Sequence, residues 1–307
     1  MPEPPGIAKS LRNPEFAAPP SARFRAMPNA LVTGCSSGFG LLAAVELARS
    51  GFRVFATLRT LDRRSALDEA AKSASVTLDV LQLDVLSEQD IASAQNVLDL
   101  SGGLEVLVNN AGFGLAGFAH DVSLDEFREQ FETNFFAPVA LTKAFLPGMI
   151  KRRRGRIINV SSLNGRVAMP GVSAYSASKF ALEGFTEALR MEIAPFGLFA
   201  SLIEPGTYRT EIFERNRREA KKMRDPASPW APILAEMEAV VNDRIARSKG
   251  DPREVALAIR SAAMASRPRL RYLVGADAHA VSMIQRALPV AWFGKLVART
   301  SKIAKLA

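Results

Sequence analysis

Three side chains near the middle of the chain could carry out acid–base chemistry at a carbon–oxygen bond. Tyr175 and Lys179 are four residues apart in a helix-like run over residues 174–193, so their side chains should share one helix face. A neighbouring ammonium favours the ionised phenol, whose free pKa of about 10 is too high for efficient acid–base work. Ser162, thirteen residues before Tyr175, adds a hydroxyl that can bind the same oxygen. We therefore predict proton transfer coupled to hydride transfer at these residues.

A glycine-rich turn near the start of the chain predicts a phosphate site. The turn spans residues 34–40 and contains Gly34, Gly38 and Gly40. It follows a buried strand at 30–33 and precedes a helix with apolar periodicity at 41–48. The start of a helix presents unpaired N–H groups, and glycines let a pyrophosphate approach them closely. The order GxxxGxG differs from the GxGxxG order of the common dinucleotide fingerprint.

Three later strands also end in turns of small residues. They are predicted at 104–108, 155–160 and 198–204, and the turns that follow are Asn109-Asn110-Ala111-Gly112, Ser161-Ser162 and Pro205-Gly206-Thr207. With the glycine turn, Tyr175 and Lys179 in this order and spacing, the chain resembles the short-chain dehydrogenase/reductase family from about residue 28 to about residue 277. Alternating strands and helices agree with an α/β fold, a doubly wound parallel sheet of the Rossmann type in a single domain. The runs at 33–38, 56–59 and 175–184 look most like the branch of 17β-hydroxysteroid and retinol dehydrogenases.

The resemblance implies a role for each matching residue. Tyr175 would be the acid/base, Ser162 rather than Ser161 would bind the reacting oxygen, and Lys179 would orient the cofactor ribose. Asn134 matches the asparagine that holds a water relay from the lysine to solvent, so the implied catalytic residues are Asn134, Ser162, Tyr175 and Lys179. The implied cofactor-binding residues are Gly34, Ser36, Ser37, Gly38, Phe39, Gly40, Arg59, Asp84, Asn110, Ala111, Gly112, Tyr175, Lys179, Pro205, Gly206, Thr207 and Thr210. The chain departs from the family at Tyr208, where a small apolar residue is common, and this change should alter the floor of the nicotinamide pocket.

The end of the second predicted strand, at 51–59, favours NADP(H) over NAD(H). An acidic residue there would bind the adenosine ribose of NAD. The chain instead has Arg59, with Arg63 and Arg64 close by. A guanidinium matches a 2′-phosphate in geometry and charge. The alternative for Arg59 is a solvated loop residue.

The sequence predicts three parts of the chain: a leader, a domain and a tail. Residues 1–27 are rich in proline and predict a flexible leader, unless translation begins naturally at Met27. Residues 28–277 form the predicted domain, in which we call residues 207–249 the lid segment. Residues 278–307 form the predicted tail, with a basic amphipathic helix at 290–306. This helix could lie on anionic lipid, or it could pack against its own domain or a partner subunit.

The lid segment predicts the class of substrate. It mixes Ile212, Phe213, Met223, Trp230 and other apolar residues with many charges, which indicates an apolar inner face under a solvated outer face. A hydrophobic, steroid- or retinoid-like alcohol or carbonyl compound is the predicted substrate, and a small ketone is the alternative. A catalytically silent cofactor-sensing or scaffold protein on the same fold is the alternative of a different class.

Composition argues against several other classes of protein, such as metalloenzymes, nucleic-acid-binding proteins and secreted proteins. One cysteine and two isolated histidines predict no metal site. The net charge of +9 invites nucleic-acid binding, but no basic stripe interleaved with aromatic residues is present, so no nucleic acid is expected. No apolar run approaches eighteen residues and no signal peptide is evident, which predicts a cytoplasmic enzyme, membrane-associated at most at the periphery. The resemblance implies a homodimer or homotetramer.

Overall fold

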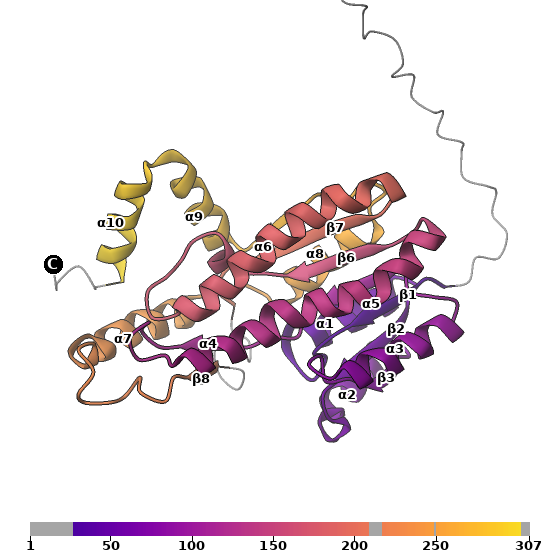
Figure 1. The fold of residues 1–307 in the computed structure, drawn as a ribbon, viewed down its shortest axis with the longest axis horizontal. Coiled ribbons are helices and arrows are strands. Elements are labelled where there is room, and N and C mark those ends of the chain that lie inside the picture. The colour runs from indigo at the N-terminus through magenta and orange to yellow at the C-terminus, as the bar shows by residue number, and fades with distance from the viewer. Residues whose placement is uncertain (1–26, 209–216, 249, 302–307) are drawn as a thin grey trace, which may run out of the picture.

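The central element of the computed structural model, which describes residues 27–208, 217–248 and 250–301, is a parallel sheet of seven strands (Figure 1). The strand order is β3-β2-β1-β4-β6-β7-β9, and every neighbouring pair is parallel. The strands are β1 (Asn29–Val32), β2 (Arg53–Leu58), β3 (Asp79–Gln82), β4 (Val106–Asn109), β6 (Arg156–Val160), β7 (Phe199–Pro205) and β9 (Arg271–Val274). The chain runs outward from β1 to β3 and starts again at β4, so a crevice opens beyond the carboxyl ends of β1 and β4. The predicted doubly wound α/β fold is confirmed.

Helices cover both faces of this sheet, because its strands are apolar on both sides. One face packs on α1 (Gly38–Arg49), α2 (Ser65–Ser73) and α8 (Arg253–Met264). The other packs on α3 (Glu88–Leu100), α5 (Ala137–Arg152) and α6 (Ser173–Ile193). One π-helical turn, Glu132–Phe136, connects α4 (Leu124–Phe131) to α5. Elsewhere in the described residues, three 3₁₀ turns lie at Leu61–Arg63, Leu163–Gly165 and Ala194–Phe196.

A second, two-stranded sheet supports the lid segment. It pairs β5 (Gly114–Ala116), which follows β4, with β8 (Arg217–Glu219), which lies in the lid segment. Phe113, Leu115, Met223 and Met237 share an apolar cluster that joins this sheet to α7 (Ala231–Arg247). The described part of the lid segment therefore has the predicted apolar inner face.

The tail contains two helices where the sequence predicted one. They are α9 (Ala276–Ala287) and α10 (Val290–Thr300), and Pro289 stands at the N-cap of α10 because proline cannot continue α9 but suits the start of a new helix. Phe293 and Val297 pack with Val281 against Leu163 and Val167, so the inner face of α10 contacts its own domain. None of the described helices is long and apolar enough to cross a membrane.

Candidate active site

A cavity of about 1000 Å³ lies at the carboxyl edge of the sheet. Residues that follow β1, β2, β3, β4, β6 and β7 line its inner side. The lid segment and the α9–α10 hairpin line its outer side. Its volume is at the upper end of the usual range for small-molecule sites, roughly 300–1000 Å³.

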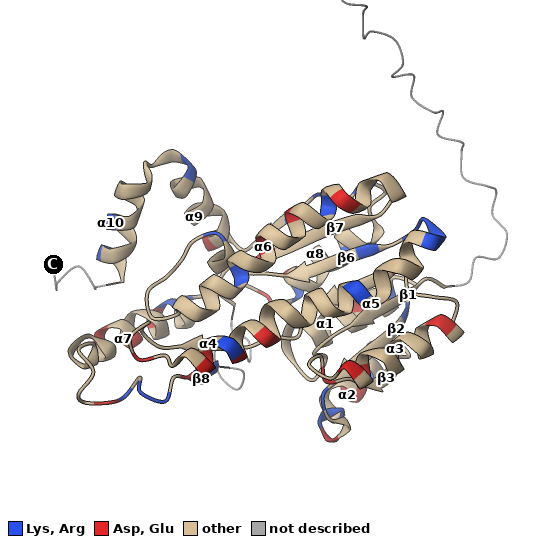
Figure 2. Ribbon diagram, viewed as in Figure 1, with Lys and Arg blue, Asp and Glu red and all other residues tan. Residues whose placement is uncertain are grey.

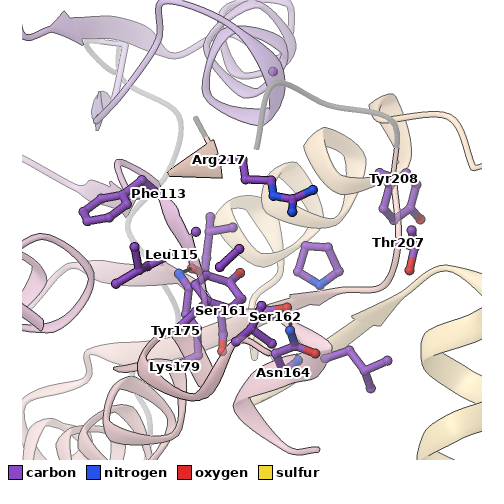
Figure 3. A pocket seen from close by; sticks show the side chains of 18 of the residues that line it. Phe113, Leu115, Ser161, Ser162, Asn164, Tyr175, Lys179, Thr207, Tyr208 and Arg217 are labelled. Atoms are coloured by element: carbon purple, nitrogen blue, oxygen red, sulfur yellow. Dashed lines mark hydrogen bonds between the residues drawn. The ribbon is translucent and has the colours of Figure 1, made fainter. Parts of the chain in front are cut away.

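Tyr175, Ser162 and Lys179 meet at the base of this cavity (Figure 3). Tyr175 and Lys179 lie one turn apart on the buried face of α6, as predicted, and Ser162 follows β6. The Nζ atom of Lys179 donates to the carbonyl oxygen of Val160 at 2.8 Å and lies 5.9 Å from the centroid of the Tyr175 ring. A proton donor, a hydroxyl and a cation therefore share one wall.

Burial dominates the protonation of these groups. It raises the pKa of Tyr175, and only a hydrogen bond with Ser162 opposes this shift. We predicted that Lys179 would lower the pKa of Tyr175, whereas the net shift is upward because burial has the larger effect. Burial also lowers the pKa of Lys179 to about 8, while the Glu183 carboxylate, one turn further along α6, raises it. Tyr175 is therefore a neutral phenol that can give up a proton.

Ser161 and Ser162 both line the cavity but have different partners. The Ser162 hydroxyl accepts from the backbone N–H of Asn164 at 3.1 Å and hydrogen-bonds Tyr175. Ser161 is buried, and its hydroxyl lies close to the Glu183 side chain beside Gly165. The geometry favours Ser162 for contact with a reacting oxygen.

Asn134 lies behind this group, in the π-helical turn. Its amide oxygen accepts from the N–H of Phe113 at 3.1 Å, and its amide nitrogen donates to the Phe113 carbonyl at 3.0 Å. The same nitrogen donates to Ser178 at 3.3 Å, and Ser178 donates to the Tyr175 carbonyl at 2.7 Å. Asn134 does not line the cavity. It connects the end of β4 to α6, and the proposed water relay remains a prediction.

The glycine turn fits a diphosphate. Gly34 and Gly38 have φ values of +72° and +57°, a backbone conformation that residues with a side chain rarely adopt. Ser37 is the N-cap of α1 but its side chain does not cap the helix, so the first N–H groups of α1 remain available to an anion. Gly40 does not line the cavity, but a Cβ there would lie 2.3 Å from the Gly34 carbonyl oxygen. Gly40 therefore permits the close packing that shapes the turn.

A hydroxyl that sequence reasoning missed holds the next turn in place. Thr33 Oγ1 accepts from the N–H groups of Asn110 and Ala111, at 2.9 and 3.0 Å. The Asn110 amide donates back to the carbonyl oxygens of Thr33 and Gly34. These bonds join the carboxyl ends of β1 and β4 at the point where the strand order reverses. A threonine at the end of a buried strand was the available signal.

Three arginines follow β2, and they are not equivalent. Arg59 and Arg63 line the cavity, and neither guanidinium group has an ion-pair or hydrogen-bond partner among the described residues. Arg64 pairs with Asp68 at 2.7 Å, on the surface of α2. Asp84 also lines the cavity, and its Oδ1 atom accepts from the N–H of Leu86 at 3.1 Å. Two free guanidinium groups and one carboxylate thus border the region beyond β2 and β3.

The turn after β7 is held by the start of α9. Thr207 donates its N–H to Asp277 Oδ2 at 2.7 Å, and a Cβ on Gly206 would lie 2.0 Å from Asp277 Oδ1. Tyr208 lines the cavity but is almost wholly buried: its hydroxyl donates to Glu254 at 2.7 Å and its ring meets Phe39 edge to face. The sequence did not point to Asp277, which lies about seventy residues away along the chain.

Most of the predicted site residues are brought together around the cavity. They are Gly34, Ser36, Ser37, Gly38, Phe39, Arg59, Asp84, Asn110, Ala111, Gly112, Ser162, Tyr175, Lys179, Pro205, Gly206 and Thr207. Gly40 and Asn134 lie just behind it, and Thr210 lies outside the described residues. Lining residues that the sequence did not assign include Phe113, Leu115 and Arg217 (Figure 3). They also include Val281, Phe293 and Val297 on the α9–α10 hairpin.

Comparison with known proteins is consistent with this arrangement. A family model described as short chain dehydrogenase matches residues 28–221. An uncharacterised oxidoreductase of Bacillus subtilis, YusZ, is 42% identical over 80% of this chain and 88% of its own. Human 17-beta-hydroxysteroid dehydrogenase type 1 is 36% identical over 79% of this chain and 76% of its own. Human retinol dehydrogenase 8 is 45% identical over 59% of each chain.

Solved structures show the same fold with either cofactor. A short-chain dehydrogenase from Streptomyces avermitilis covers 91% of this chain and 98% of its own, with 32% identity and a TM-score of 0.74. A metagenomic short-chain oxidoreductase in complex with NADP covers 80% of this chain and 96% of its own, with 29% identity and a TM-score of 0.63. A Burkholderia phymatum enzyme in complex with NAD covers 85% of this chain and 92% of its own, with 25% identity and a TM-score of 0.71.

Proposed function

Because the chain belongs to the short-chain dehydrogenase family, we propose that it is an NADP(H)-dependent oxidoreductase that interconverts an alcohol and a ketone or aldehyde. The observation that carries this proposal is the meeting of Tyr175, Ser162 and Lys179 at the base of a cavity whose inner edge is the glycine turn. A homodimer or homotetramer is the assembly that the resemblance implies.

The proposed chemistry follows from the protonation states. Bound NADPH would supply a hydride to the carbonyl carbon of the substrate. Ser162 would hydrogen-bond the carbonyl oxygen as it gains negative charge, and Tyr175 would donate its phenolic proton to that oxygen. Lys179, buried one helical turn away, would stabilise the phenolate that this transfer leaves behind. In the oxidative direction the phenolate would remove the hydroxyl proton.

The choice of NADP(H) rests on Arg59 and Arg63, which line the cavity beyond the end of β2 and whose guanidinium groups have no ion-pair or hydrogen-bond partner among the described residues. A charge-assisted hydrogen bond contributes about 1.5–3 kcal/mol, so losing one should weaken NADPH binding by roughly 10- to 100-fold. Titration of Arg59→Ala with NADPH and NADH should show this loss for NADPH alone. Arg64→Ala is the matched control, because Arg64 pairs with Asp68 outside the cavity. Tighter binding of NADH than NADPH by the unaltered protein would reject the assignment.

A hydrophobic substrate is supported by the outer walls of the cavity. They include Met237 and Val241 from α7, and Val281 and Phe293 from the hairpin. The names of two relatives refer to a retinol and a hydroxysteroid, which are bulky apolar alcohols. We therefore propose a steroid- or retinoid-like substrate class.

A substrate panel tests the class directly. Steroid, retinoid, aliphatic and aromatic carbonyl compounds and alcohols would be incubated with NADPH or NADP⁺, and the absorbance of the reduced nicotinamide would be followed. We expect turnover of the bulky apolar compounds. Turnover of small polar ketones alone would reject the hydrophobic class. Tight NADPH binding without turnover of any compound would instead favour a cofactor sensor on the same fold.

A further inference from the structure

The outer face of α10 carries an exposed aromatic residue followed by two basic residues. Trp292, Lys295 and Arg299 lie at i, i+3 and i+7 on the helix, so they project from one side. The opposite side, with Phe293 and Val297, packs against Leu163, Val167 and Val281. Trp292 is 68% exposed, and Val290 at the start of the helix is 89% exposed. Besides its packed inner face, the helix therefore has exposed apolar side chains, Val290 and Trp292, that its own domain does not cover.

The charge of the tail has one sign. Residues 278–307 contain no aspartate or glutamate and five lysines or arginines, namely Arg286, Lys295, Arg299, Lys302 and Lys305. The first three belong to the described residues, and no ion pair joins them to another described residue. Along α10 the only charged bands are basic (Figure 2). A surface that combines exposed apolar side chains with unneutralised cations is complementary to an anionic lipid surface.

We propose that the outer face of α10 binds the surface of an anionic bilayer, with Trp292 in the interface and Lys295 and Arg299 at the headgroups. Tryptophan favours the boundary between water and lipid because its ring is apolar and its N–H is polar. The cations add attraction to acidic headgroups and can extend their apolar stems along the boundary. The helix lies on the membrane and does not cross it, since no described helix is long and apolar enough to span it.

Helix α10 also lies next to the cavity. Its other face supplies Phe293, Leu296 and Val297 to the wall of the cavity. The cavity and the proposed lipid contact therefore lie on two faces of the same helix. If the proposed function holds, an apolar substrate dissolved in the bilayer would enter the cavity beside α10, without passing through bulk water.

The two tryptophans of the chain make the test specific. Trp230 stacks on Phe118 with ring centroids 4.7 Å apart inside the lid cluster, whereas Trp292 is exposed. The emission of Trp292 should move to shorter wavelength when vesicles of phosphatidylserine and phosphatidylcholine are added, and pure phosphatidylcholine vesicles should produce a much smaller change. Trp230→Phe should keep the shift and Trp292→Phe should abolish it.

Charge variants measure the electrostatic contribution to membrane binding. Each basic residue near an anionic surface contributes a factor of about five to binding, so Lys295→Gln with Arg299→Gln should weaken partitioning by roughly 30-fold. Lys72→Gln with Lys143→Gln is the matched control, because both lysines are exposed on helices α2 and α5 and the charge change is equal. This pair should bind as the unaltered protein does.

Three outcomes would overturn the proposal. One is the absence of any shift with anionic vesicles, and another is a shift that persists in Trp292→Phe. The third is a shift that depends on protein concentration and not on vesicles, which would assign Trp292 to a contact between two copies of the chain. The measurement requires neither cofactor nor turnover, so its result is separate from that of the substrate panel.

Discussion

The two sides of the cavity are built from different kinds of contact. On the inner side, buried hydrogen bonds join neighbouring elements: Asn109 donates to Asn159 at 2.8 Å, and Asn159 donates to Thr186 on α6 at 2.8 Å. On the outer side, exposed ion pairs hold the lid segment, such as Arg224 with Glu219 and Glu238 at 2.8 Å. No residue of α10 is buried. Buried, directional bonds tolerate little change, whereas solvated pairs and partly exposed apolar contacts tolerate much. The inner side should therefore determine the reaction and the outer side its substrate.

The largest effect should come from the acid on the inner side. Tyr175→Phe removes the phenolic proton and little volume, so carbonyl reduction should fall by roughly 10²- to 10⁴-fold, as expected for loss of a general acid. Binding of NADPH, followed by fluorescence, should change little. Near-normal turnover of a confirmed substrate by this variant would show that another group supplies the proton.

The next largest effect should come from the packing of the glycine turn. Gly40→Ala places a Cβ 2.3 Å from the Gly34 carbonyl and 2.4 Å from the Asn110 amide, so we expect a loss of about 3 kcal/mol in unfolding free energy. Gly184→Ala is the control, since nothing lies within 4 Å of its position on the exposed side of α6. Removing a helix-interior glycine there should stabilise the protein by roughly 0.5–1 kcal/mol. Equal unfolding midpoints in urea for both variants would contradict this account.

A smaller effect, on the pH dependence of folding stability, should come from the buried charged residues near Lys179. Glu183 on α6 and Glu204 on β7 both bind Arg271 from β9, and Arg166 also binds Glu204. Burial and the nearby Glu204 raise the pKa of Glu183 to about 7. Because the folded state holds this proton more tightly, Glu183 contributes stability below its unfolded pKa of 4.5, and that stability is lost as pH rises through about 7. Glu183→Gln should remove this loss.

The same variant should move the titration of Lys179. The folded-state pKa of Lys179, about 8, lies below the ordinary lysine value of 10.5, so stability rises as pH increases between these values. Without the Glu183 charge the folded pKa falls further, and the rise should begin at lower pH. Thermal unfolding between pH 4 and pH 11 would record both changes. Glu187→Gln, which removes the outer partner of Arg271, should leave both features in place.

The smallest effect is expected in the lid segment. Arg224→Gln breaks the ion pairs with Glu219 and Glu238, but the Arg224 side chain is 59% exposed. Water and salt replace such a pair at little cost. The unfolding temperature should stay within experimental scatter, and turnover should change only through substrate affinity. A loss comparable to that of Gly40→Ala would show that the lid segment is as tightly constrained as the inner side.

The sequence predicted the inner side well because its signals are local. Glycines between a strand and a helix, and a tyrosine and lysine one turn apart, have fixed spacings that the backbone converts directly into geometry. The outer side was predicted less well. Helix α9 and the contact of the tail with the cavity were missed, because amphipathic periodicity identifies an apolar face and does not say what covers it.

The amino-acid sequence by itself determined the order of strands and helices, the glycine turn and the pairing of Tyr175 with Lys179, since each depends on residues close together along the chain. Only the tertiary structure decided that Arg59 and Arg63 line the cavity while Arg64 binds Asp68. It also decided that Asp277 holds the turn at Thr207, and that burial raises the pKa of Tyr175. These features depend on desolvation and on contacts between distant segments, which exist only once the chain has folded.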